Sequence, residues 1–472
     1  MRGLAGGAKS GPMGIVFLIG VLIWFAPPPA GVEIRAWNLF AIFVATIVGI
    51  MLRPLPMGAV AMMGVATIVL TRTLSIEEAL SGFGNRVTWL IAIAFFVARS
   101  FIKTGLGKRI AFLFMRALGR KTLGLGYSLV LTDLVLAPAI PSNTARGGGV
   151  LYPIVLSLAK AYGSEPGDGT ARKIGAFLIL TTFHSTVITG AMFLTGMVAN
   201  PLAAQLAGDQ GVHITWANWA IAASVPGLAS LTLVTWMIYR LCPPEIRETP
   251  KAVEIAQDEL DKMGGMTPHE KILLVVFILL LGLWIFGGLL EMHSTSAGLV
   301  GLAVLLVTGV LTWQDVLREE KAWDAFIWVS AIAMMASFLN TLGLTDWFSQ
   351  AVGGWIIGVH WLVAFVGLSL VYFYSHYFFA SNTAHVGSMY APFLAVALAA
   401  GSPPLLSALT LGYFSNLFSS MTHYGTAPAP IFFGSEYVEL RFWWKIGFFI
   451  SLAHITIWLG LGGLWWKVLG LW

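Results

Sequence analysis

Two short polar motifs lie within long apolar stretches and hold the residue types best suited to binding chemistry. They are Ser142-Asn143-Thr144 and Ser381-Asn382-Thr383, and Pro or Gly flanks each of them. Each motif offers hydroxyls, an amide and exposed backbone N–H groups. Helix N-termini that point at such a motif favour a carboxylate, and its oxygens can ligate a cation such as Na⁺. The alternative is that these residues only cap a helix break, since all three types favour caps and turns.

A basic residue occupies the same position after each motif, Arg146 in the first and His385 in the second. A charge at membrane depth costs roughly 3 kcal/mol or more, so such residues usually face the protein interior and serve function. Two basic groups would suit a ligand with two carboxylates. Two structural alternatives stay open: Arg146 pairs with an acid such as Asp133, or His385 is a neutral core histidine.

A second pair of segments has the composition of unwound helix. They are Thr195–Pro201 (TGMVANP) and Tyr424–Pro430 (YGTAPAP). Gly, Pro and Asn within an apolar span free carbonyl groups for a cation or a substrate, so Gly425, Thr426 and Pro428 are expected at the binding site. A simple proline kink is the alternative. Three histidines in or beside apolar spans are interpreted as packed helix residues rather than ligands: His184, His376 and His423.

The composition places these motifs in a bilayer. Of the 472 residues, 57% are hydrophobic and 10% are charged, against roughly 25% charged in a typical soluble domain. The formal charge of +5 comes from residues that lie between apolar stretches, which gives no footprint for nucleic acid. The single cysteine, Cys242, excludes an intrachain disulfide and a cysteine-based metal cluster.

The apolar stretches predict an all-α polytopic membrane protein, because a bilayer core about 30 Å thick requires roughly 20 apolar residues per helix. Eleven spans are predicted, near residues 12–30, 36–52, 57–71, 87–103, 174–204, 214–240, 271–290, 295–312, 325–342, 404–424 and 443–466. Two further apolar stretches, 122–160 and 359–399, hold the Ser-Asn-Thr motifs near their middles. Polar residues flanked by Pro or Gly cannot face lipid there, so both stretches are predicted to be re-entrant hairpins.

The distribution of Lys and Arg predicts the orientation. With the N-terminus in the cytoplasm, the basic loops and the long polar linker 243–270 all lie on the cytoplasmic side. The first hairpin then enters from the cytoplasm and the second from the periplasm. We therefore expect a multi-pass protein of the bacterial inner membrane, in contact with the lipid bilayer.

The two hairpins correspond to each other at a constant offset of 239 residues, which predicts a duplication. The chain divides into N-terminal transmembrane helices (1–56), a first repeat (57–242), the linker (243–270) and a second repeat (271–472). Each repeat holds an odd number of spans, so the copies run through the membrane in opposite senses. Inverted repeats with broken helices are typical of secondary transporters. No nucleotide-binding loop or nucleophile elbow is seen, and an enzyme is not expected.

At these residues the chain resembles the divalent anion/sodium symporter family, in particular the branch of citrate–succinate antiporters and plastid 2-oxoglutarate–malate translocators. Three segments carry the resemblance: Pro141–Pro153 (PSNTARGGGVLYP), Ala380–Pro392 (ASNTAHVGSMYAP) and Thr422–Gly434 (THYGTAPAPIFFG). The resemblance implies that both Ser-Asn-Thr motifs bind substrate carboxylates and line sodium sites, with candidate ligands Ser142, Asn143, Gly196, Asn382 and Gly425. It also implies a homodimer with an elevator mechanism.

The chain departs from the sodium-coupled members of that family in the second elements. Those members carry a Gly-Thr-Pro-Pro-Asn-like segment in each half, whereas here the segments read GMVAN from Gly196 and GTAPA from Gly425. These departures, together with the two basic residues, favour exchange of dicarboxylates such as 2-oxoglutarate, malate, succinate or citrate without sodium. Sodium-coupled symport is the alternative, and an intramembrane enzyme is a remote one.

Overall fold

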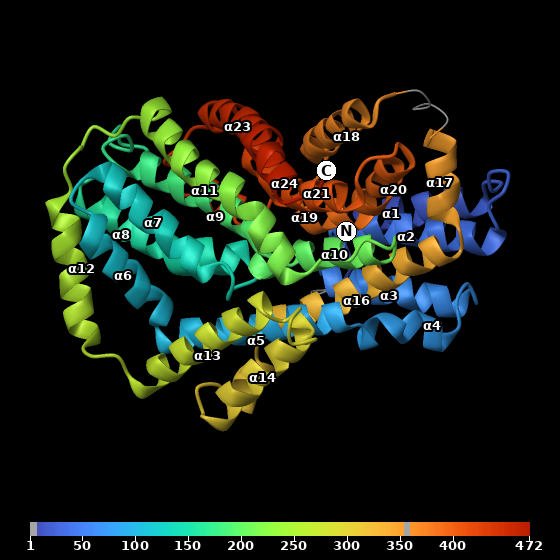
Figure 1. Ribbon diagram of the computed structural model, residues 1–472, viewed down its shortest axis with the longest axis horizontal. Coiled ribbons are helices and arrows are strands. Elements are labelled where there is room, and N and C mark those ends of the chain that lie inside the picture. The colour runs from blue at the N-terminus through green and yellow to red at the C-terminus, as the bar shows by residue number, and fades with distance from the viewer. Residues whose placement is uncertain (1–6, 354–358) are drawn as a thin grey trace.

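The protein is helical throughout residues 7–353 and 359–472, which are the residues that the computed structural model describes, and no strand occurs among them (Figure 1). The prediction of an all-α protein is confirmed. Residues 1–6 of the predicted N-terminal segment and residues 354–358 lie outside the described part of the chain.

Eight of the described helices are long and apolar enough to cross a membrane by length and composition. They are α2 (Ile34–Leu52), α5 (Arg86–Thr104), α9 (Gly175–Met192), α11 (Trp216–Leu241), α13 (Pro268–Ile285), α16 (Glu320–Thr341), α18 with its 3-10 extension (Trp361–Phe378) and the stretch from α23 (Leu440–Ile455) to α24 (Gly463–Val468). All but α18 coincide with predicted spans. The other four predicted spans contain the shorter helices α1 (Ser10–Phe25), α3 (Met57–Leu70), α14 (Ser294–Val307) and α21 (Pro404–Leu417).

Both predicted hairpins are broken helices with the same local plan. The first runs from α7 (Thr122–Leu136) through the π-helical η2 (Thr144–Leu151) to α8 (Tyr152–Ala161). The second runs from α18 through α19 (Asn382–His385) and the π-helical η5 (Val386–Tyr390) to α20 (Ala391–Ala399). Pro153 and Pro392 follow the π-helical segments. Since proline has no N–H for the preceding turn, each of them loosens the helix next to its motif.

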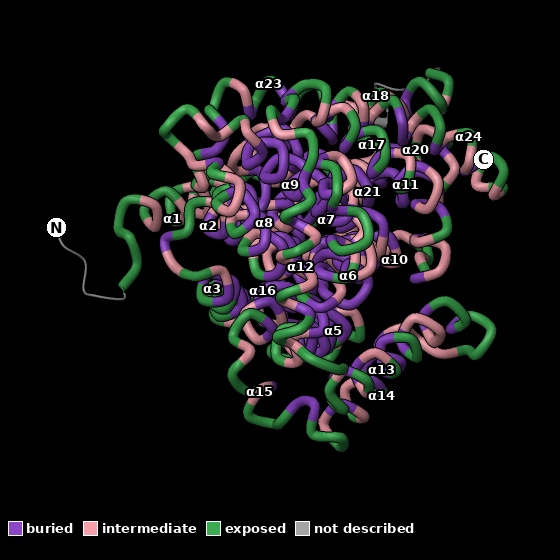
Figure 2. The backbone as a smooth tube through the Cα atoms, turned by 90° about the vertical axis from the view of Figure 1, so that its left-hand side faces the viewer, coloured by how far each residue is buried: buried purple, intermediate pink, exposed green. Residues whose placement is uncertain are grey.

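The two hairpins lie toward opposite ends of the long axis of the molecule. Figure 1 shows α7 and α8 near α12 (Pro250–Met263), whereas α18 and α20 lie at the other end. Between them runs α9, whose residues are all buried (Figure 2). The short helix α10 (Ala199–Gly208) of the first half packs against η5 and α20 of the second, and α22 (Ala429–Phe433) of the second half packs against α9 of the first. Phe432 of α22 also packs edge-on against Tyr152 of α8, so each half contacts the hairpin of the other.

Two short helices, one in each predicted repeat, begin in the same way. Both α4 (Ile76–Leu80) and α15 (Trp313–Leu317) start with a capping box, formed by Ser75 with Glu78 and by Thr312 with Asp315. In each box the hydroxyl accepts from the N3 backbone N–H and the carboxylate accepts from the N-cap N–H, which satisfies two end groups of the helix. A long helix follows each short one, α5 in the first half and α16 in the second.

The polar linker is an anchored helix, α12, that packs against α6 (Leu106–Leu118). Arg109 on α6 donates from Nε to Glu270 Oε1 over 2.6 Å and from Nη1 to the Gly264 carbonyl over 2.8 Å. Thr249 Oγ1 donates to the Gly119 carbonyl over 2.6 Å. The linker therefore holds α6 and the start of α13 in one place.

Candidate functional site

The tips of the two hairpins meet at a single side chain, Asn416 on α21. Asn143 Nδ2 from the first motif donates to Asn416 Oδ1 over 3.0 Å, and Asn382 Nδ2 from the second motif donates to the same oxygen over 3.2 Å. Asn382 Nδ2 also lies 2.7 Å from Ser419 Oγ and 3.1 Å from the Ser415 carbonyl. Residues 239 positions apart in the sequence are thus joined through one amide oxygen inside the protein.

The close approach of the tips depends on Gly190 in α9. A Cβ atom at this position would lie 2.1 Å from Asn416 Nδ2 and 2.5 Å from Asn143 Oδ1, so only glycine leaves room for both amides. Sequence reasoning missed Asn416 and Gly190. The available signal was a polar residue in the middle of the apolar stretch 404–424, and it is weak because such residues also bond within their own helix.

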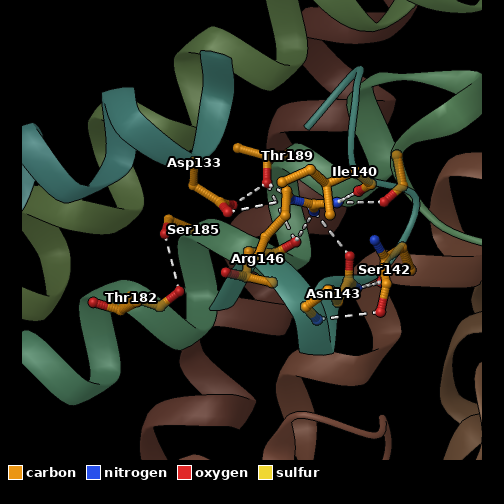
Figure 3. A network of polar contacts seen from close by, with 12 residues as sticks. Asp133, Ile140, Ser142, Asn143, Arg146, Thr182, Ser185 and Thr189 are labelled. Carbon is orange, nitrogen blue, oxygen red and sulfur yellow. Dashed lines mark hydrogen bonds and ion pairs between the residues drawn. The ribbon is translucent and has the colours of Figure 1, made fainter. Parts of the chain in front are cut away.

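Arg146 lies at the centre of a buried network behind the first tip (Figure 3). Its Nη1 donates to the carbonyl oxygens of Ile140 and Gly196, each over 2.6 Å. Its Nη2 donates to Asn143 Oδ1 over 2.9 Å, and its Nε donates to Asp133 Oδ1 over 3.2 Å. Asp133 also accepts a short hydrogen bond from Thr189.

Arg146 forms the ion pair with Asp133 that the sequence analysis gave as the structural alternative. It also donates to three neutral oxygens that the sequence did not predict. The guanidinium has no exposed surface, and its donors point at acceptors of the protein. A ligand carboxylate would have to displace one of these bonds to touch Arg146 directly. The contact between Nη2 and Asn143 Oδ1 instead fixes the amide of Asn143, so that its Nδ2 faces Asn416.

His385 belongs to a buried pair behind the second tip. Its Nδ1 lies 3.1 Å from Nδ1 of His376, and Nε2 of His376 lies 2.7 Å from the Gly425 carbonyl oxygen. Because a carbonyl only accepts, His376 donates from Nε2. Nε2 of His385 lies 3.1 Å from Ser375 Oγ. The rings stack with Phe418 at centroid distances of 3.7 and 4.6 Å. His376, which the sequence suggested was a packed residue, thus contacts the second unwound segment.

The donors behind the two tips make similar contacts, although His376 is not the residue that corresponds to Arg146 at the offset of 239. Arg146 donates to the carbonyl of Gly196 in the first half, and His376 donates to that of Gly425 in the second. Three of the five expected sodium-ligand groups are therefore occupied by protein N–H donors: Asn143 Oδ1 and the carbonyls of Gly196 and Gly425. The positive guanidinium of Arg146 beside two of these oxygens makes the same position electrostatically unfavourable for a sodium ion.

The other predicted site residues differ in exposure. Ser142, Thr144, Ser381 and Thr383 are partly exposed, whereas Gly425, Thr426 and Pro428 are buried in the unwound second element. Ser142 Oγ and Ser381 Oγ each accept from the backbone N–H three residues later, as caps do. Asn382 Oδ1 and Asn416 Nδ2 are buried and make no hydrogen bond among the described residues. Such unpaired polar atoms are unfavourable unless a ligand or water satisfies them.

A cavity of about 270 Å³ opens beside the first tip. It lies near the end of α5 that leads to Gly105, which neighbours Met263 of α12 in the linker. Ala145, which follows the first motif, lines it together with Arg99 and Ile102 of α5 and Arg318 to Lys321 at the start of α16. Sequence reasoning missed Arg99, although an arginine inside a predicted span is a usual signal for an interior function.

Broken hairpins that meet inside a bundle of apolar helices define a membrane transporter rather than an enzyme. The comparisons with known proteins agree: the model of the sodium:sulfate symporter transmembrane region matches residues 10–472. The chain therefore belongs to the divalent anion/sodium symporter family, as the sequence motifs indicated.

Two curated relatives and one solved structure are similar to nearly the whole of this chain. It is 56% identical over 462 residues to YflS of Bacillus subtilis (strain 168), named as a proposed malate transporter, with 98% of this chain and 97% of that protein covered. It is 52% identical to the chloroplastic dicarboxylate transporter 1 of Spinacia oleracea, with 99% and 82% covered. The structure of the Alcanivorax borkumensis YdaH transporter shares the fold, with a TM-score of 0.55, 15% identity and coverage of 98% and 97%.

Proposed function

We propose that the protein exchanges small dicarboxylates of the 2-oxoglutarate, malate and succinate class across the bacterial inner membrane. The observation that carries this proposal is the junction of both Ser-Asn-Thr tips at Asn416, which brings two sets of hydroxyls and amides together. Two such sets suit a ligand with a carboxylate at each end. The names of the two relatives, a malate transporter and a dicarboxylate transporter, support the same ligand class.

In this proposal Arg146 and the histidine pair replace bound cations, because they hold the oxygen atoms of the tips in place. The guanidinium draws the oxygens of Ile140, Asn143 and Gly196 toward one positive centre, as a metal ion would, but it is covalently attached and never leaves. His376 does the same for the carbonyl of Gly425. No dissolved cation is then required to form the binding site.

The proposal of exchange rests on the free energy that would be required to move the empty binding site across the membrane. Without a ligand, Asn416 Nδ2 is a buried donor with no acceptor among the described residues, and the hydroxyls of both motifs are partly exposed and bond to water. Moving these groups past apolar helices would leave them without partners, at roughly 1–3 kcal/mol for each. A bound dicarboxylate accepts hydrogen bonds from Asn416 Nδ2 and from these hydroxyls, so the loaded protein crosses and the empty one does not.

The wider architecture is part of the proposal. Two inverted repeats, 57–242 and 271–472, would present hairpins 122–160 and 359–399 from opposite sides, with the N-terminus and the linker in the cytoplasm. The positions of the hairpins at opposite ends of the long axis support this arrangement (Figure 1). Alternating access would then move both tips as one body, in an elevator motion within a homodimer.

A counterflow assay tests the exchange. Proteoliposomes preloaded with malate should take up labelled 2-oxoglutarate in sodium-free buffer, and empty proteoliposomes should not. Equal uptake into loaded and empty vesicles would refute obligatory exchange. Competition by unlabelled succinate, malate, tartrate and citrate in the same assay ranks the substrates.

One observation favours the alternative, a sodium-coupled di- or tricarboxylate symporter. Asn382 Oδ1 is a buried oxygen without a hydrogen-bond donor among the described residues, which is a suitable ligand for a cation at the second tip. Under this alternative, empty vesicles accumulate substrate when sodium is added outside, with a rate that saturates in sodium. The counterflow assay therefore separates the two functions.

A further inference from the structure

An arginine inside a membrane helix faces the cavity beside the first hairpin tip. Arg99 lies in α5, five residues before its end at Thr104, and is half-buried. Among residues 7–353 and 359–472 it forms no ion pair: the five pairs found there involve other side chains. An unpaired guanidinium at this depth is costly unless water or a ligand reaches it, and the cavity provides that access.

The charges around the cavity leave a positive excess. Arg99, Arg318 and Lys321 contribute three positive groups, and Glu319 and Glu320 contribute two negative ones. Burial raises the pKa of Glu319, and the charges of Arg99 and Lys321 act against that rise. Arg318, Glu320 and Lys321 are exposed, so water screens them. The half-buried Arg99 is screened least and dominates the potential that a small anion meets on the way to the tip.

The cavity lies between α5 and the first hairpin. Phe95, Ala98, Arg99 and Ile102 form one face of α5, and Ala145 belongs to the first hairpin, directly between Thr144 and Arg146. Its volume of about 270 Å³ lies just below the range of roughly 300–1,000 Å³ that holds drug-sized ligands, which suits a four- or five-carbon acid. An anion that enters here meets Arg99 before it meets the Ser-Asn-Thr motif.

We propose that Arg99, with the cavity between α5 and the first hairpin, forms an entry site that binds one carboxylate of the substrate on the linker side of the membrane and passes it to the first tip. This inference rests on the proposed transport of dicarboxylates. The guanidinium offers two parallel N–H groups, which match the geometry of a carboxylate. Arg99 remains on α5 while the hairpin moves, so the entry site acts only when the tips are open to the linker side.

The test compares substrate affinity from the two sides of the membrane. Inverted and right-side-out membrane vesicles, both preloaded with malate, report the KM for labelled 2-oxoglutarate at the linker side and at the opposite side. Loss of a charged hydrogen-bond donor corresponds to roughly 10-fold or more in affinity. We expect Arg99→Gln to raise the linker-side KM about 10-fold, with little change in the KM from the opposite side, and Arg99→Lys to recover part of the loss.

Arg86 provides the matched control, because it lies at the other end of α5 and lines a different cavity. Arg86→Gln should leave the linker-side KM unchanged. A salt series on the wild-type protein gives a second readout: the linker-side KM should rise with ionic strength and that rise should shrink in Arg99→Gln. An equal KM change on both sides, or none, would overturn the entry site while leaving exchange itself intact. Absence of exchange in the wild-type vesicles would overturn the proposed function instead.

Discussion

Replacing Arg146 with lysine separates positive charge from the shape of the guanidinium. Arginine reaches Asp133, the carbonyls of Ile140 and Gly196, and Asn143 Oδ1 from a planar fork, with contacts of 2.6–3.2 Å. Lysine carries the same charge on one nitrogen with three donors, and it cannot reach oxygens on both sides of that fork. We expect it to keep the contact with Asp133 and to lose at least two of the other three.

The magnitude follows from the bonds that are lost. A hydrogen bond to a charged group contributes roughly 1.5–3 kcal/mol, so two lost bonds amount to about 3–6 kcal/mol. Water at the first tip would recover part of this. Since about 1.4 kcal/mol corresponds to a factor of ten, a remaining loss of about 3 kcal/mol lowers exchange roughly 100-fold. Arg146→Ala should be more severe, because an uncompensated buried Asp133 costs about 3–5 kcal/mol of stability and reduces transport as well.

The assay is the initial rate of sodium-free malate exchange in proteoliposomes, paired with the melting temperature of the purified protein. Arg116→Lys on the exposed face of α6 is the matched control and should behave like the wild type. For Arg146→Lys we expect a folded protein with exchange near background. Exchange within about two-fold of the wild-type rate would show that the fork geometry is irrelevant to the tip and would refute the role assigned to Arg146.

Three further predictions follow from the same contacts. Gly190→Ala places a methyl group on Asn416 and should abolish exchange, whereas Asn416→Ala leaves both tip amides without their shared acceptor and should raise the KM for malate about 10-fold from both sides. His376→Gln keeps a donor for the Gly425 carbonyl and should retain more exchange than His376→Leu, which leaves that carbonyl without a donor, when both variants are measured in the same proteoliposome assay. Arg109→Ala leaves Glu270 buried without its partner and should lower the free energy of unfolding by about 3–5 kcal/mol, measured as a lower melting temperature with the membrane orientation unchanged.

The sequence predicted the features that depend on local composition. Runs of apolar residues located the membrane helices, and Pro and Gly beside Ser142-Asn143-Thr144 located the first break, because these signals act within a few residues. The spans predicted at 57–71 and 404–424 contain the helices α3 and α21, which have only 14 residues each. A helix of 14 residues is shorter than the roughly 20 residues that are needed to cross a bilayer. The position of such a helix in the membrane therefore depends on the segments packed around it.

Contacts between residues that are distant in the sequence could not be predicted from local composition. Nothing near Asn143 indicates that its partner is Asn416, because the pairing arises from the packing of α9 and α21 at Gly190. The role of His376 was hidden for the same reason, since Gly425 follows it by 49 residues. Arg146 was recognised as unusual from its position alone, but its four acceptors come from three separate segments of the chain.

Sodium dependence tests most directly whether side chains of the protein occupy the place of bound cations at both hairpin tips. The measurement is the initial rate of malate–2-oxoglutarate exchange in preloaded proteoliposomes, with external sodium varied from none to 100-fold above any contaminating level at constant ionic strength. We predict one rate throughout the series, because Arg146 and His376 already hold the oxygens that sodium would need. A rate that starts near zero and saturates as sodium rises would contradict the account.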